Sequence, residues 1–210
     1  MQINPVNGIR APKTANKLPL PIDVDQMSQL LNLEQSDPLA IRDLALMELM
    51  YSCGLRLMEL SALNIGDVDL QDRTVPVVGK GGKTRVLPVG KAASLSLVRW
   101  LEIRSQLVPS DEQALFISQR GTRLSHRAIQ QRLHYWGIKQ NIDNNVHPHR
   151  LRHSFASHLL ESSGNLRAVQ ELLGHADIST TQIYTHVDFQ QLAKVYDNAH
   201  PRARKIKNRS

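Results

Sequence analysis

Apolar residues fall at helical spacing along most of the chain. Between residues 38 and 53 they occupy nearly every side of the predicted helix, so we expect this helix to be buried. Asp37 and Pro38 mark its beginning, because an aspartate side chain caps a helix and proline fits the first helical position. Gly54 marks its end, and the pattern predicts a short helix directly after it, in RLMELSAL (residues 56–63).

The pattern changes in RTVPVVGKGGKTRVLPVG (residues 73–90), where two runs of β-branched residues surround a glycine-rich stretch. This arrangement predicts an antiparallel hairpin with Lys80 and Lys83 at its tip. Pro76 indicates an edge strand, because proline has no N–H group for a neighbouring strand. The stretch superficially resembles a phosphate-binding P-loop, but no Ser or Thr follows the lysine in the required order. Nucleotide binding is therefore not expected.

Helical spacing returns after the hairpin. It predicts a helix over residues 91–107, a short extended segment at 114–118, and a helix that Ser125 caps and Gly137 ends. The buried side of this last helix is predicted to consist of Ile129, Leu133 and Trp136.

Four further helices are predicted in the last third of the chain. The first covers residues 149–163 and ends at Gly164. The second begins at Asn165 and ends at Gly174, the third is capped by Ser179, and the fourth covers 188–198. The inward-facing residues of the second are predicted to be Leu166, Val169, Leu172 and Leu173. The whole pattern indicates a mainly α fold with a small antiparallel β-sheet, which is an α+β class.

Charge and composition exclude few classes of function, and the sequence motifs are more informative. The chain has 210 residues and a formal net charge of +7, of which five positive charges lie in the last ten residues, PRARKIKNRS. The remainder is only mildly basic, so charge alone does not predict DNA binding, and the tail is either a solvated end or a binding arm. The single cysteine, Cys53, fits a buried structural thiol in a reducing cytoplasm. No apolar run reaches 18 residues, so membrane insertion is not expected.

The segment VHPHRLRHSFASHLL (residues 146–160) concentrates imidazole and guanidinium groups. On a helix His149, Arg152 and His153 share one side and point away from the core. The opposite, buried side is predicted to hold Leu151, Phe155 and Leu159. A zinc site could use the two histidines at i, i+4, but an adjacent arginine repels a divalent cation. An anion site fits better, because arginine and imidazole both donate hydrogen bonds, and a merely polar helix face is the third interpretation.

Two further segments add candidate residues. In LLGHADISTTQIYTH (residues 172–186) His175 follows a helix end, and Tyr184 lies nine residues later on a new helix. A tyrosine in this position is ordinarily a half-buried packing residue; it becomes a nucleophile towards phosphorus where cations surround the phosphate. Arg56 begins a short helix, where a phosphate could bind, or it is a surface arginine paired with Glu59.

Taken together, these motifs resemble those of the tyrosine recombinases, the phage integrase family. The resemblance runs from about residue 20 to 200 and rests on an arginine in GLR, a hairpin lysine in GKG, H-x-x-R on a helix, LGH, and a tyrosine nine residues later. In this chain the matching residues are Arg56, Lys80, His149 with Arg152, His175 and Tyr184.

The resemblance implies a chemical cycle on double-stranded DNA. Tyr184 would attack a scissile phosphate and form a 3′-phosphotyrosyl bond, while Arg56 and Arg152 stabilise the charge on the non-bridging oxygens. Lys80 would be the general acid for the leaving 5′-oxygen, with His149 assisting proton transfer. His175 would hydrogen-bond the phosphate. The bond energy is kept in the covalent link, so the resemblance implies no metal and no cofactor.

Family knowledge also supplies expectations about DNA contacts and partners. The DNA-binding residues are predicted to be Lys83, Arg85, Arg123, Arg127 and Arg150. Implied partners are a dif-like DNA site, a XerD-type recombinase in a heterotetramer and an FtsK-type translocase, for resolution of chromosome dimers in the cytoplasm. Alternatives that share the chemistry are a phage or plasmid integrase, a XerD-like paralogue and a relaxing topoisomerase; a DNA-binding module with a dead site and a metal hydrolase do not share it.

The predicted domain organisation has three parts. Residues 1–21, which include four prolines, indicate a linker or lead-in, residues 22–200 a catalytic domain, and residues 201–210 a basic tail. Full-length members of the family carry an additional N-terminal helical domain that closes around DNA. We therefore expect this chain to be the catalytic part of a longer protein.

Overall fold

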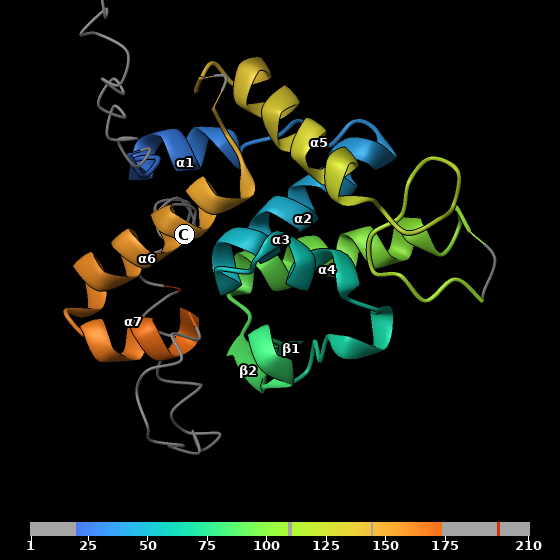
Figure 1. Ribbon diagram of the computed structural model, residues 1–210. Helices are drawn as coiled ribbons and strands as arrows, with labels where there is room; N and C mark the ends of the chain where they lie inside the picture. The colour runs from blue at the N-terminus through green and yellow to red at the C-terminus, as the bar shows by residue number, and fades with distance from the viewer. Residues whose placement is uncertain (1–19, 109–110, 144, 174–196, 198–210) are drawn as a thin grey trace, which may run out of the picture.

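The computed structural model describes residues 20–108, 111–143, 145–173 and residue 197, with the main chain alone at positions 80, 167 and 171. Its elements confirm a mainly helical fold with one small antiparallel sheet (Figure 1). The helices are α1 (Val24–Leu30), α2 (Pro38–Cys53), α3 (Leu57–Ala62), α4 (Lys91–Arg104), α5 (His126–Lys139), α6 (Pro148–Ser163) and α7 (Leu166–Leu173). The strands are β1 (Thr74–Val78) and β2 (Thr84–Pro88), and short 3₁₀ turns lie at Ile65–Asp67 and Lys80–Gly82.

Helix α2 lies at the centre of the described part, and α4 and α6 pack against it (Figure 1). Every residue from Ala40 to Cys53 is buried, as the apolar pattern predicts. The predicted cap is confirmed, because the Asp37 carboxylate accepts hydrogen bonds from the backbone N–H groups of Leu39 and Ala40 at 2.7 and 3.0 Å.

The end of α2 is shaped by Gly54. This residue has a φ of 57°, in the left-handed region, and it ends the helix as expected. A Cβ atom at this position would lie 2.4 Å from Cδ1 of Phe155, so only glycine lets the end of α2 come this close to α6. The chain after Gly54 is thereby brought beside α6.

A buried carboxylate ties α5 to α2. Asp43 accepts hydrogen bonds from Arg42 on its own helix and, on α5, from Nε of Arg132 at 2.5 Å and from the Trp136 indole at 2.8 Å. The buried residues of α5 include the three that the sequence predicts. The predicted helix end at Gly137 is wrong: α5 continues to Lys139, and Gly137 leaves room for Val146, whose Cγ2 would lie 2.7 Å from an added Cβ.

The predicted hairpin is confirmed. Strands β1 and β2 pair antiparallel, with Pro76 opposite Val86, and the sheet described consists of these two strands only, so each is an edge strand. The glycine-rich tip forms a 3₁₀ turn that begins at Lys80. Strand β2 contacts α2, so the base of the hairpin is anchored on the central helix.

Helices α6 and α7 form an adjacent pair (Figure 1). Gly164, with a φ of 63°, ends α6 as predicted. On α7 the residues Val169, Leu172 and Leu173 are buried, but Leu166 is 54% exposed, so its predicted inward orientation is wrong; it is the first residue of the helix. The helices predicted after Ser179 and over 188–198 lie outside the described residues.

One described residue near the end of the chain contacts the hairpin side of the fold. The Asp197 carboxylate accepts a hydrogen bond from the backbone N–H of Lys91 at 2.7 Å, at the start of α4, and one from Arg73 at 3.1 Å. None of the described helices is both long and apolar enough to span a membrane.

Candidate active site

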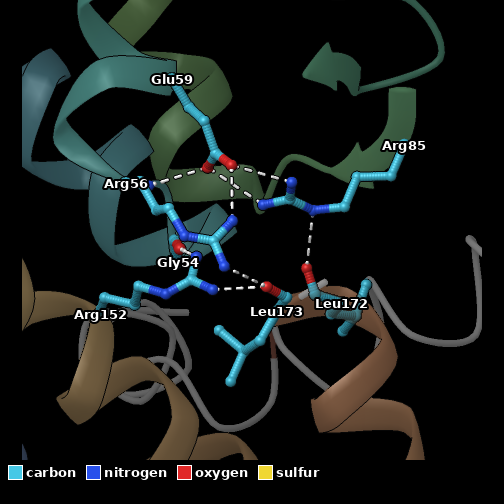
Figure 2. A network of polar contacts seen from close by, with 7 residues as sticks. All are labelled: Gly54, Arg56, Glu59, Arg85, Arg152, Leu172 and Leu173. Carbon is cyan, nitrogen blue, oxygen red and sulfur yellow. Dashed lines mark hydrogen bonds and ion pairs between the residues drawn. The ribbon is translucent and has the colours of Figure 1, made fainter. Parts of the chain in front are cut away.

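Arg56 lies directly before α3, two residues after the Gly54 turn. Glu59, one turn into the helix, accepts a hydrogen bond from the Arg56 backbone N–H at 2.9 Å and one from its guanidinium at 3.0 Å. The ion pair with Glu59 that the sequence suggests is therefore present. It does not make Arg56 an ordinary surface residue, because its other terminal nitrogen points towards α7 and α6 (Figure 2).

Arg152 approaches the same place from α6. The predicted buried side of this helix is confirmed, because Leu151, Phe155 and Leu159 are buried. Arg152 is half-buried and does not point into solvent as His149 and His153 do. Its guanidinium donates to the carbonyl oxygen of Gly54 and, at 2.5 Å, to that of Leu173. Arg56 donates to the same Leu173 oxygen at 3.4 Å, so one oxygen atom contacts both guanidinium groups (Figure 2).

A third arginine, Arg85 of β2, completes the cluster (Figure 2). Its two terminal nitrogens donate to both oxygens of Glu59, at 2.9 and 3.0 Å, and its Nε donates to the Leu172 carbonyl at 3.0 Å. The side chain is 17% exposed. These contacts place Arg85 inside the arginine cluster and argue against its predicted role as a direct DNA contact.

The cluster has an excess of positive charge. Three guanidinium groups face the single carboxylate of Glu59, which leaves two positive charges in excess. Burial, together with the neighbouring charges of Arg56 and Arg85, lowers the pKa of Arg152 to about 10. Burial alone would raise the pKa of Glu59, but its hydrogen bonds from Arg85 and Arg56 outweigh that effect and hold the pKa below its usual value. An anion beside Arg152 would relieve this repulsion.

The oxygen atoms that hold the arginines include the last two carbonyls of α7. The carboxyl end of a helix carries a partial negative charge and leaves its carbonyl groups without helical partners. The Leu172 and Leu173 carbonyls are such groups, and they accept from all three arginines. Phosphate oxygens are stronger acceptors of the same kind, so this arrangement suits recognition of a phosphate.

The remaining residues of the HPHRLRH segment occupy different positions. His149 and His153 are exposed, and the His149 ring lies 6.5 Å from that of His147. His147 caps α6: its Nδ1 accepts a hydrogen bond from the Arg150 backbone N–H at 3.3 Å. Burial, followed by the charges of His149 and Arg150, lowers the pKa of His147. No role was predicted for His147, although its place directly before Pro148 resembles the Asp37–Pro38 helix start.

For three predicted catalytic residues the structure describes the main chain alone or nothing. The main chain of Lys80 lies at the hairpin tip, at the start of the 3₁₀ turn. His175 and Tyr184 lie outside the described residues. The structure thus brings Arg56 and Arg152 together, adds Arg85 and Glu59 to them, and places the end of α7, two residues before His175, against the cluster.

The predicted DNA-binding residues divide into two groups. Lys83, Arg123 and Arg127 are exposed. Arg123 donates to the carbonyls of Ser61 and Leu63 and to the Asn64 side chain, and so holds the loop after α3. Arg150 is 8% exposed and donates to the Leu20 carbonyl and to Asp143. Its buried, paired guanidinium argues against a DNA contact.

The metal and redox interpretations find no support in the described residues. Within residues 20–108, 111–143 and 145–173 no group of three potential metal ligands occurs. Cys53 is buried, and burial raises the pKa of its thiol to about 12, which keeps it protonated. The prediction that Cys53 is a structural thiol is confirmed.

Comparison with known proteins identifies the class. Residues 21–191 match the model of the phage integrase family, and the chain belongs to that family. It is therefore a tyrosine recombinase, an enzyme that binds DNA and cleaves and rejoins its strands in site-specific recombination.

Within this family, the chain is similar to several Xer recombinases. The chain is 56% identical to tyrosine recombinase XerC of Actinobacillus pleuropneumoniae over 207 residues, which are 99% of this chain and 67% of that protein. The crystal structure of XerA recombinase is 32% identical, with a TM-score of 0.70, and the match covers 91% of this chain and 70% of that one. The structure of XerH bound to palindromic difH substrate in a post-cleavage complex is 30% identical, with a TM-score of 0.67. The match covers 87% of this chain and 54% of that one.

Proposed function

We propose that Arg56 and Arg152 hold the scissile phosphate of DNA while Tyr184 attacks it. The observation that supports this most directly is that both guanidinium groups donate to one oxygen atom, that of Leu173. Donors that meet at one oxygen without DNA are already oriented to share the non-bridging oxygens of a phosphate. Such preorganised donors supply a large part of the catalysis of reactions at charged oxygens.

In the proposed cycle the phenol oxygen of Tyr184 bonds to phosphorus and the bond to the 5′-oxygen breaks. Lys80 gives a proton to the leaving oxygen, and His149 assists removal of the phenol proton. His175 hydrogen-bonds the phosphate. The resulting 3′-phosphotyrosyl bond keeps the energy of the phosphodiester, so the 5′-hydroxyl of another strand can reverse the step and complete strand exchange. No metal or cofactor takes part in the proposed steps.

The proposed biological role follows from the similarity to XerC proteins. We propose that the chain acts with a XerD-type recombinase in a heterotetramer on a dif-like chromosomal site, under the control of an FtsK-type translocase, and so resolves chromosome dimers at cell division. Its place of action would be the cytoplasm, where the chromosome lies. Support comes from the 56% identity to a XerC that extends over 99% of this chain.

A nicked suicide duplex that bears a Xer-type site tests the chemistry. The 210-residue chain and its Tyr184→Phe variant are incubated with the duplex in EDTA, and covalent adducts are separated on a denaturing gel. We expect an adduct from the parent alone. An adduct that persists in Tyr184→Phe, or one that EDTA abolishes, would contradict the proposed nucleophile or the metal-free mechanism.

The partner assignment needs a separate measurement. Strand exchange is followed on a dif-like duplex with this chain and a XerD-type recombinase, together and apart. We expect complete exchange only with both proteins. Exchange by this chain alone on a phage or plasmid attachment site would favour an integrase.

A further inference from the structure

Arg85 joins three parts of the fold that are far apart in the sequence. It leaves β2, binds both oxygens of Glu59 on α3, and donates to the Leu172 carbonyl at the end of α7 (Figure 2). The two bonds to Glu59 have the fork geometry that only arginine provides. The side chain is 17% exposed, so it is largely enclosed by these partners.

The same guanidinium lies near the hairpin residue that precedes Lys80. Gly79 directly follows β1, and its N–H donates to the carbonyl of Lys83, the residue directly before β2, at 2.8 Å. A Cβ atom added to Gly79 would lie 3.3 Å from a terminal nitrogen of Arg85. The guanidinium therefore lies close to the residue that directly precedes Lys80, at the base of the turn on which Lys80 lies.

We propose that Arg85 is a positioning residue for the general acid: it fixes the Lys80 turn against Glu59, the carboxylate that also holds Arg56. This inference rests on the proposed function, in which Lys80 protonates the leaving 5′-oxygen. One carboxylate then sets the distance between the arginine that binds the phosphate and the turn that bears the proton donor. The exposed residues Lys83, Arg123 and Arg127 remain the candidates for direct DNA contacts.

The proposal predicts which chemical step fails when Arg85 is changed. In cleavage the bond between phosphorus and the 5′-oxygen breaks, and that oxygen takes a proton from Lys80 while the tyrosine oxygen bonds to phosphorus. If sulfur replaces the bridging 5′-oxygen, the leaving thiolate needs no proton, because thiols have pKa values of about 8.5. A variant that misplaces only the proton donor is therefore restored by the sulfur substrate, whereas a variant with impaired phosphate binding is not.

The test measures adduct formation by Arg85→Gln on two nicked Xer-type duplexes, one with the normal phosphodiester and one with a 5′-bridging phosphorothiolate. On the normal duplex we expect a rate about 10- to 100-fold below the parent, a part of the ~10²–10⁴-fold that a general acid contributes. On the phosphorothiolate we expect a rate within about threefold of the parent, the same pattern that Lys80→Ala should give.

Matched variants make the outcomes distinct. Arg99→Gln removes an exposed arginine of α4 that bonds to Gln35, and it should behave as the parent on both duplexes. Equal slowing of Arg85→Gln on both duplexes, with Lys80→Ala restored, would overturn the inference and assign Arg85 to support of Arg56 through Glu59. Lack of a Tyr184-dependent adduct from the parent would instead overturn the proposed function.

A second variant guards against misfolding of Arg85→Gln. Gly79→Ala keeps every charge and requires no positive φ, since Gly79 has a φ of −86°, but its methyl group presses on the Arg85 guanidinium. We expect a smaller defect, about 3- to 10-fold, that the phosphorothiolate also removes. Circular dichroism at the assay temperature must show that both variants are folded, and a Gly79→Ala defect of equal size on both duplexes counts against the inference.

Discussion

At the scale of single residues, Gly54 decides where Arg56 lies. Its left-handed conformation ends α2, its lack of a side chain admits the Phe155 ring, and its carbonyl accepts a hydrogen bond from Arg152. The sequence predicts the helix end, because glycine after a helical pattern is a common stop signal. The contact with Phe155 could not be predicted, because the two residues are about a hundred positions apart.

Gly54→Ala should therefore destabilise the protein by roughly 2–4 kcal/mol. About 1 kcal/mol comes from the positive φ and about 1–3 kcal/mol from the clash with Phe155. Urea unfolding measures the loss. The matched control is Gly164→Ala, which also has a positive φ but meets nothing within 4 Å, and it should cost only about 1 kcal/mol. Equal losses in the two variants would show that the Phe155 contact contributes nothing.

At the scale of elements, the site lies where four of them meet. The start of α3, strand β2, helix α6 at Arg152 and the last carbonyls of α7 surround Glu59 and the three arginines. Element ends have backbone groups without regular partners, so they are where charged side chains find acceptors. The start of α6 follows the same principle, since a neutral His147 caps it.

The His147 cap should make α6 sensitive to acid. The pKa of His147 is lowered in the folded protein by burial and by His149 and Arg150, so the stability from the neutral ring is present above the ordinary value of 6.5. It is lost as the pH falls through the lower, folded value, because the unfolded chain then binds the proton more readily. We expect His147→Asn, which keeps a good cap that does not titrate, to have a smaller fall in Tm between pH 7.5 and 5.5 than the parent.

Thermal melts at both pH values measure this difference. His158, whose pKa burial also lowers, remains in both proteins and contributes equally to their acid sensitivity. A fall in Tm that is as large in His147→Asn as in the parent would assign the acid sensitivity to His158 or to other groups.

At the scale of the whole molecule, charge is distributed unevenly. Five of the positive charges lie in residues 201–210, whereas the cations of the arginine cluster are already engaged by Glu59 and by carbonyl oxygens. We therefore expect the tail to contribute attraction to DNA over a distance and the arginine cluster to bind one phosphate, as proposed above.

Removal of residues 201–210 should weaken DNA binding and make it less sensitive to salt. The magnitude of the slope of log K against log salt should decrease by up to about 4.5, since each phosphate contact contributes about 0.9 and the tail has five cations. Fluorescence anisotropy with a Xer-type duplex over a range of salt concentrations measures the slope. Adduct formation at saturating protein should be unchanged, and an unaltered slope would identify the tail as a solvated end.

The sequence by itself determined most of the described elements, and it supplied the candidate catalytic residues. The helix starts at Asp37 and Pro38, the stops at Gly54 and Gly164, and the hairpin depend on neighbouring residues, and the structure confirms them. The end of α5 was missed because Gly137 serves packing against Val146, which is decided by another segment. The roles of Arg85 and Arg150 were missed for the same reason, because the sequence does not distinguish an arginine that contacts DNA from one that binds a carboxylate of the protein. Only tertiary structure brings Glu59, Asp143 and the α7 carbonyls to those arginines, because such contacts join residues that local spacing does not relate.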